Sequence, residues 1–185
     1  MTTIKKLVIN AEQIELSDDD ILDITRNKTN LMTYASLENY NNIDDVLGEH
    51  GACVLLYQHD ESEGHWCCIF KSAQNDDTLI FHDPYGIKLD SEIEKSPFQM
   101  RRHNGEIVPH LSHLLEKSNY KVIQDTYQFQ EFKHDINTCG KFVCVRLLFR
   151  DYTPRKYKHL LLNSFEGMNP DKTVSMLTLL FSHPE

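Results

Sequence analysis

The chain has 185 residues, of which 40% are hydrophobic and 25% are charged; this composition is typical of a globular protein and excludes the disordered, collagen-like and coiled-coil classes. Its 19 Lys and Arg residues against 28 Asp and Glu residues give a formal net charge of -9, which argues against nonspecific nucleic-acid binding as the main role. No apolar run approaches the roughly 20 residues of a membrane span and no signal-peptide pattern follows Met1, so we expect one domain over residues 1–185 that does not contact a membrane.

The first predicted element is a helix that begins at Ser17. A hydroxyl cap followed by three aspartates suits the positive end of a helix dipole. Apolar residues at positions 21, 22 and 24 supply the buried side of this helix. The next segment, 30–47, is expected to be irregular or weakly helical and to end at Gly48.

Three short apolar runs follow, each bounded by polar turn residues: 52–57, 66–70 and 78–81. Their length predicts strands rather than helices. Because short loops join them, we expect these strands to form an antiparallel or mixed sheet.

The remainder of the chain is predicted to be mainly helical. Pro109 opens a helix, and two further strand candidates lie at 120–123 and 126–132. Apolar residues then recur at three- and four-residue spacing over 142–149, which predicts a helix buried on most of its surface. Two last helices are expected over 154–162 and from Asn169-Pro170 to near His183-Pro184. The order predicts an α+β fold, a small mixed sheet packed against a central buried helix.

Three reactive side chains lie at the ends of these elements. His65 opens a strand, Asp83 closes another, and Cys139 begins the central helix. The helix dipole and free backbone N–H groups stabilise a thiolate at such a position. If the two strands are neighbours, Asp83 can orient His65, which then serves the cysteine as its base. His82 competes for the base role, but it should point to the opposite face of its strand.

Acyl transfer also needs a donor for the oxyanion, and two glutamines are candidates. Gln128 and Gln130 lie in the predicted strand 126–132, where a period of two places them on one face. Either amide could act together with the backbone N–H of Cys139.

These motifs, taken in order, resemble a known family. Gly-His-Trp at 64–66, Asp-Pro-Tyr-Gly at 83–86, a glutamine, and Thr-Cys-Gly-Lys-Phe-Val-Cys at 138–144 are similar to the cysteine proteases that include adenain and the SUMO-specific proteases (clan CE). The Asn-Thr-Cys-Gly step resembles in particular the maturation proteases of virophages and large DNA viruses. The resemblance covers about residues 50–150.

The resemblance implies a role for each residue: Cys139 as nucleophile, His65 as general base, Asp83 as its orienting acid and a glutamine as oxyanion donor. The family's glutamine precedes the cysteine by six or seven positions, where this chain has Phe132 and Lys133. Of the two available glutamines we prefer Gln130, with a longer loop before the cysteine.

The resemblance further implies a papain-related fold of the adenain type and cleavage at small-residue, glycine-containing sites, with Trp66 lining a narrow approach to the sulfur. We therefore expect a monomeric cysteine endopeptidase without a metal or other cofactor. Its expected substrates are viral capsid or core precursor proteins, in the host cytoplasm or virus factory and in the virion. Adenain is assisted by DNA, but the charge of -9 leads us to expect no DNA cofactor here, despite a basic stretch over 141–158.

Two alternatives stay open. The same chemistry suits an isopeptidase that removes ubiquitin-like proteins, and a protease-like fold can also be retained as a non-enzymatic assembly or binding module. The five cysteines, an odd number that includes the adjacent pair Cys67 and Cys68, indicate a reducing, intracellular setting. We predict that the four cysteines other than Cys139 pack as small buried residues.

Overall fold

The computed structural model describes residues 3–58, 64–95 and 97–182. Its centre is a five-stranded mixed sheet with the strands in chain order, β1-β2-β3-β4-β5. The two central pairings, β2–β3 and β3–β4, are antiparallel, and the two outer pairings are parallel. The strands are β1 Asn30–Thr33, β2 Ala52–Gln58, β3 Gly64–Lys71, β4 Thr78–His82 and β5 Lys121–Asp125.

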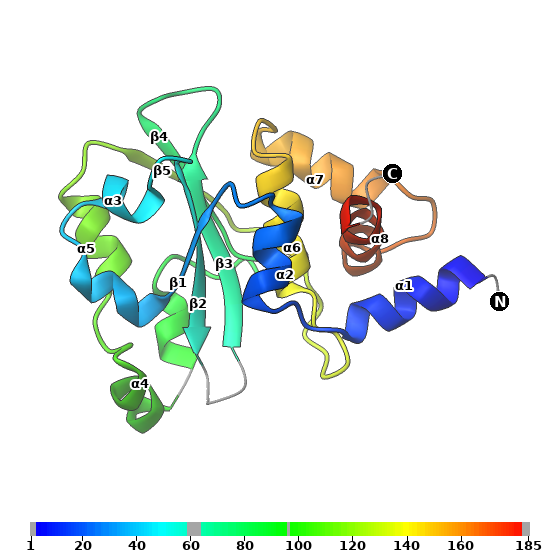
Figure 1. The fold of residues 1–185 in the computed structure, drawn as a ribbon, viewed down its shortest axis with the longest axis horizontal. Coiled ribbons are helices and arrows are strands. Elements are labelled where there is room, and N and C mark those ends of the chain that lie inside the picture. The colour runs from blue at the N-terminus through cyan, green and yellow to red at the C-terminus, as the bar shows by residue number, and fades with distance from the viewer. Residues whose placement is uncertain (1–2, 59–63, 96, 183–185) are drawn as a thin grey trace.

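Helices cover both faces of the sheet (Figure 1). On one side lie α2 (Asp18–Ile24), α6 (Cys139–Leu148), α7 (Pro154–Asn163) and α8 (Pro170–Ser182), with α1 (Thr3–Gln13) packed on α8. On the other side lie the short 3-10 helix η1 (Tyr34–Asn39), α3 (Ile43–Leu47) and α5 (His110–Glu116). The shorter elements η2 (Ser91–Lys95) and α4 (Phe98–Asn104) precede α5 in the chain.

The alternation of side chains along β3 divides the interior into two apolar layers. Cys67 and Ile69 pack on the side of η1, α3 and α5, whereas Trp66, Cys68 and Phe70 pack against α6. Since α6 also packs on α8, it is enclosed on most of its surface, as its apolar sequence predicts. Its first residue is placed at the end of the sheet where β3 begins.

The predicted α+β class with a mixed sheet and a central buried helix is confirmed. The strands expected at 52–57, 66–70, 78–81 and 120–123 correspond to β2, β3, β4 and β5. The helix start at Ser17 is also confirmed, because Ser17 and Asp20 form a reciprocal capping box. The predicted end of the last helix near 183–184 lies outside the described residues.

One prediction from the pattern is incomplete and another is wrong. The segment 30–47 contains the 3-10 helix η1 and the short helix α3, which ends before Gly48 as expected, but it also contains the strand β1, which pairs in parallel with β2. The segment 126–132 is not a strand: the backbone N–H groups of Phe129 and Gln130 both donate to the carbonyl of Pro84, so the chain turns around one acceptor instead of forming a ladder. Helices α1 and α4 were not predicted.

The basic stretch over 141–158 is not a continuous surface patch. Lys141 and Arg146 are both buried. The guanidinium of Arg146 donates to the carbonyls of Phe149 and Tyr152, at 3.0 Å each, so it closes the end of its own helix. These two cations are therefore structural and unable to contact DNA.

The cysteines are placed as predicted. Cys53, Cys67, Cys68 and Cys144 are free and fully buried, while Cys139 is free and half-buried. Among the described residues, no helix has the combination of length and hydropathy that crossing a bilayer requires.

We predict that Gly86→Ala lowers the free energy of unfolding by about 2–3 kcal/mol, more than Gly167→Ala does. Both glycines have a left-handed backbone, with φ of 69° and 72°. A Cβ at Gly86 would lie 2.7 Å from the carbonyl oxygen of Thr126, whereas a Cβ at Gly167 meets nothing within 4 Å. Urea unfolding of the two variants measures the difference, and equal losses would show that the close approach at Gly86 has no cost.

Candidate active site

The candidate site contains a hydrogen bond between two side chains at the ends of neighbouring strands, His65 and Asp83. His65 is the second residue of β3, and Asp83 follows directly after β4. The antiparallel register, in which Cys68 faces His82, brings both side chains to the same end of the sheet. His65 Nε2 and Asp83 Oδ2 are 2.8 Å apart, and both side chains are almost completely buried, with 2% and 1% exposed.

Asp83 also organises the turn that follows it. Its second oxygen, Oδ1, accepts hydrogen bonds from the backbone N–H groups of Tyr85 at 2.8 Å and Ile87 at 3.3 Å. An aspartate that accepts from the backbone of its own turn is a common turn residue. Here the same carboxylate serves the turn with one oxygen and the histidine with the other, so its orientation is defined twice.

Cys139 meets this pair from the α6 side. It is the first residue of α6, where backbone N–H groups lack intrahelical partners. Its side chain lies within hydrogen-bonding reach of the His65 ring. Because Nε2 of His65 is bound to Asp83, Nδ1 is the ring nitrogen left for the thiol. The structure thus brings together the three side chains that the sequence singles out.

The electrostatics of His65 favour its charged form. Burial alone disfavours the imidazolium, but the carboxylate of Asp83 and the hydrogen bond and charge of Cys139 outweigh it, and the pKa of His65 is raised well above its ordinary value. A histidine held in this way can keep a proton at neutral pH and release it to a departing group.

The two glutamines do not share a face, in contrast to the sequence prediction. Gln130 is buried, with 2% exposed, whereas Gln128 is exposed and donates to the carbonyl of Gln130. The Gln130 amide points to the loop before Cys139, where Nε2 lies 3.5 Å from the carbonyl oxygen of Ile136. A contact of that length is weak, and Oε1 of the same amide is buried without a hydrogen-bond partner among the described residues.

Aromatic rings cover the histidine. The ring of Tyr85 stacks on His65 with centroids 4.8 Å apart, and Phe132 stacks on the outer side of Tyr85 at 4.1 Å. Phe132 is 62% exposed. The rings form a stack from the buried histidine to the surface, and its outer end is an apolar face that a bound chain can contact.

Trp66 lies beside the first turn of α6. Only 7% of it is exposed, and a Cβ at Gly140 would lie 3.5 Å from its Cδ1 atom and 3.1 Å from Cβ of Leu16. Glycine after the cysteine therefore allows α6, Trp66 and the N-terminal segment to approach one another closely. Trp66 thus packs against the residue that follows Cys139, and most of its side chain is buried.

His82 contacts Phe129 and Tyr157 and takes no part in the bond between His65 and Asp83. It is fully buried on the α6 side, with its ring 5.3 Å from that of Tyr157 in an edge-to-face contact. Burial and the nearby charge of Arg146 hold its pKa well below the ordinary value. A neutral imidazole enclosed against Tyr157 is a poorer candidate for a base than His65.

Contacts with the N-terminal segment surround the cysteine and were not predicted. The backbone N–H of Asn137 donates to the carbonyl of Glu12 at 2.8 Å, and its side chain donates to that of Gln13. The ammonium of Lys141 donates to the carbonyl of Ile14, and burial lowers the pKa of Lys141 to about 8. The end of α1 and the residues after it therefore hold the chain on both sides of Cys139. Backbone carbonyls leave no signal in the sequence by which these contacts could be found.

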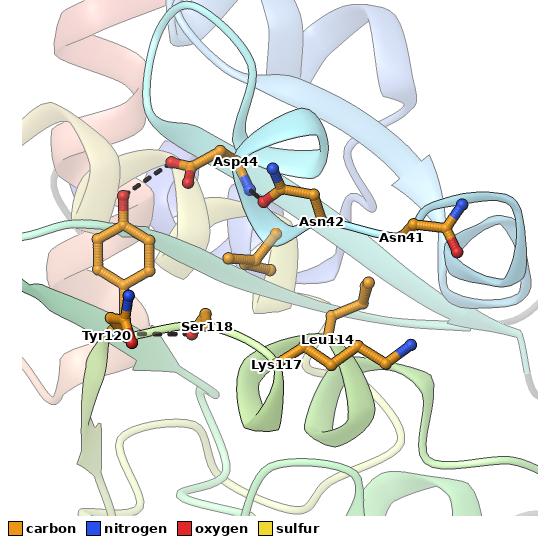
Figure 2. A pocket seen from close by; sticks show the side chains of 9 residues that line it. Asn41, Asn42, Asp44, Leu114, Lys117, Ser118 and Tyr120 are labelled. Carbon is orange, nitrogen blue, oxygen red and sulfur yellow. Dashed lines mark hydrogen bonds between the residues drawn. The ribbon is translucent and has the colours of Figure 1, made fainter.

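A separate cavity lies between the segment leading into α3 and the end of α5 (Figure 2). Its polar groups bond to one another: the hydroxyl of Tyr120 donates to Asp44, and the backbone N–H of Asp44 donates to Asn42. None of His65, Asp83 and Cys139 lines it. Within 3–58, 64–95 and 97–182, no cluster of three or more His, Cys, Asp or Glu side chains is arranged to hold a metal ion.

Comparisons with known proteins identify a relative but no activity. No family model matches the chain. A protein of Sputnik virophage that carries the name Uncharacterized protein V9 is 36% identical over 170 residues, which are 91% of this chain and 96% of the virophage protein. The virophage source of this relative agrees with the resemblance to virophage proteins that the motifs carry.

We predict that Asp83→Asn lowers the pKa of His65, because the opposite charge that favours the imidazolium is removed. In the wild type the proton stays on the ring as pH rises past 6.5 and is lost only at the raised pKa. The stability that this proton provides is accordingly complete below the unfolded pKa and disappears as pH passes the folded value.

Nuclear magnetic resonance titration of the imidazole measures the effect, with His65→Gln to assign the signal. Asp77→Asn, at an exposed carboxylate bonded to Lys121, is the matched control and should leave the titration unchanged. A His65 pKa that is the same in Asp83→Asn and wild type would contradict the prediction.

Proposed function

The chain belongs to the same family as protein V9 of Sputnik virophage, and from its candidate site we propose that it is a cysteine endopeptidase. The observation that carries the proposal is the buried bond between His65 and Asp83, with the thiol of Cys139 within hydrogen-bonding reach of the same ring. Nucleophile, base and a third group that orients the base are the recognisable parts of such a site.

The proposed reaction has two halves. His65 takes the thiol proton of Cys139, and the sulfur bonds to the carbonyl carbon of the substrate. The carbon–nitrogen bond then breaks as the imidazolium of His65 gives that proton to the leaving amine, which forms a thioester and the first product. His65 next takes a proton from a water molecule, whose oxygen bonds to the same carbon. The carbon–sulfur bond breaks, which releases the acid, and the return of the proton from His65 to the sulfur restores the thiol.

We propose that the oxyanion of each tetrahedral intermediate accepts hydrogen bonds from the backbone N–H of Cys139 and the side-chain amide of Gln130. The N–H is free because it lies at a helix start. The amide is buried beside the loop that leads to the cysteine, and it is held there by one long contact to Ile136. Donors that are positioned before the reaction act most strongly on developing charge.

We further propose that the substrates are viral capsid or core precursor proteins, cleaved at glycine-containing sites, and that the fold is related to papain in the manner of adenain. The resemblance of the motifs and the virophage source of the relative support this assignment. We propose that Trp66, which packs against the first turn of α6, and the stacked pair Tyr85 and Phe132 line the approach of an extended chain to the sulfur. The enzyme would act as a monomer without a DNA cofactor, in the host cytoplasm or virus factory and in the virion.

We predict that Cys139→Ala abolishes hydrolysis of glycine-containing precursor peptides, whereas Cys144→Ala, in the same helix, keeps at least half of the wild-type kcat/KM. Cys144 is buried and burial raises the pKa of its thiol, so it cannot attack a substrate. Mass spectrometry after brief treatment of the folded protein with iodoacetamide should find the label on Cys139.

The same assay distinguishes the substrate classes. Cleavage of ubiquitin-like conjugates without cleavage of precursor peptides would make the chain a deconjugating enzyme. Retention of all hydrolysis in Cys139→Ala would end the proposal of an enzyme, and would leave an assembly or binding role.

We predict that Gln130→Ala lowers kcat by about 100-fold, the typical effect of losing one oxyanion donor, and that Gln128→Ala changes it less than threefold. Gln130 is buried next to the loop before the cysteine, whereas Gln128 is exposed and donates to the carbonyl of Gln130. Steady-state kinetics of the two variants decide between them, and a larger loss in Gln128→Ala would reverse the assignment.

A further inference from the structure

Asp171 is a buried carboxylate that is distant in sequence from the triad motifs. It is the second residue of α8 and is completely shielded from solvent, with 0% exposed. Acidic residues in the first turn of a helix usually interact with the helix dipole from the surface. Asp171 instead turns inward, and both of its oxygens bind other segments of the chain.

The two bonds of Asp171 reach the two sides of the proposed oxyanion site. Its Oδ1 accepts a hydrogen bond of 2.5 Å from the hydroxyl of Thr138, and its Oδ2 accepts one of 3.1 Å from the backbone N–H of Glu131. Thr138 directly precedes Cys139, and Glu131 directly follows Gln130. One carboxylate therefore bonds to the neighbour of each oxyanion donor.

We propose that Asp171 is a positioning residue that sets the separation of the two oxyanion donors, the backbone N–H of Cys139 and the side-chain amide of Gln130. This inference rests on the proposed function. The loop 131–138 connects the two donors without helix or strand structure, so its own backbone bonds do not determine their separation. The rigid first turn of α8 supplies a fixed point for both.

A second contact from the same turn supports this role. Asn169, which caps α8 by accepting from the backbone N–H of Lys172, donates from its side-chain amide to the carboxylate of Glu131 at 3.1 Å. Glu131 is thus held through its main chain by Asp171 and through its side chain by Asn169. Burial raises the pKa of Asp171, while the bonds from Thr138 and Glu131 favour its charged form. Its oxygens have no contact with His65, so Asp171 acts on the donors and not on the base.

The test compares three substitutions in the full chain. Asp171→Ala removes both bonds and should lower kcat about tenfold or more, with KM changed less than threefold. Thr138→Val removes one bond and should have a smaller effect in the same direction. Asp171→Asn should restore part of the loss, since its amide oxygen can accept from Glu131 and its NH₂ group can donate to the Thr138 hydroxyl. Thr178→Val, which removes a buried hydroxyl bonded to Val174 in the same helix, is the matched control and should keep wild-type kcat.

A second readout separates positioning from general damage. Alkylation of Cys139 by iodoacetamide passes through no oxyanion, so its rate should stay within twofold of wild type in each variant, whereas inhibition by a peptide aldehyde ending in glycinal should weaken in parallel with kcat. If Asp171→Ala does not fold, the comparison of Thr138→Val with Thr178→Val decides. Equal kcat in these two, or an alkylation rate that falls as much as kcat, overturns the role of Asp171 and leaves the enzyme intact. A wild-type chain that neither hydrolyses peptides nor binds the aldehyde overturns the proposed function itself.

Discussion

The buried hydrogen bond between His65 and Asp83 is the interaction on which the candidate site depends. Removing a carboxylate and an imidazole from water has a large cost unless both are paired and hydrogen-bonded. Here the histidine bonds to Asp83 through Nε2 and has the thiol of Cys139 within reach of its ring, and the carboxylate accepts from the ring and from two backbone N–H groups. The antiparallel register of β3 and β4 maintains this pairing, because a slip of one residue would turn one of the two side chains to the other face of the sheet.

Cys139 and Gln130, the other residues of the candidate site, are not positioned by strand pairing. Cys139 and Gln130 are joined by a loop, and that loop is held by residues from both ends of the chain: carbonyls at 12–14 bind Asn137 and Lys141, and Asp171 binds the residues next to the two donors. The motifs that reveal the chemistry occupy the middle of the sequence, but the geometry of the nucleophile depends on segments about 125 residues before it and about 30 after it.

The sequence predicts what has a local cause. Three local patterns identified the correct elements: apolar runs of strand length, a capped helix start and a helix that is apolar on most sides. His65, Asp83 and Cys139 stand out because each lies at the beginning or the end of a strand or helix. The strand β1 could not be found in this way, since its short run resembles a loop and is a strand only by pairing with β2. Period-two spacing placed Gln128 and Gln130 on one face, but the segment has no ladder partner, and the carbonyl of Pro84 turns it. Asp171 has the appearance of an ordinary first-turn acid, and only the tertiary structure shows that it turns inward.

The residues of the candidate site are held by two different kinds of structure, the sheet and a loop. The His65–Asp83 pair is anchored at the ends of two paired central strands, whereas the loop before Cys139 is held by bonds to the end of α1 and to the first turn of α8, two helices that pack on each other. The packing of the two terminal helices, far from the strands that hold the histidine, therefore bears on the position of the loop that leads to Cys139.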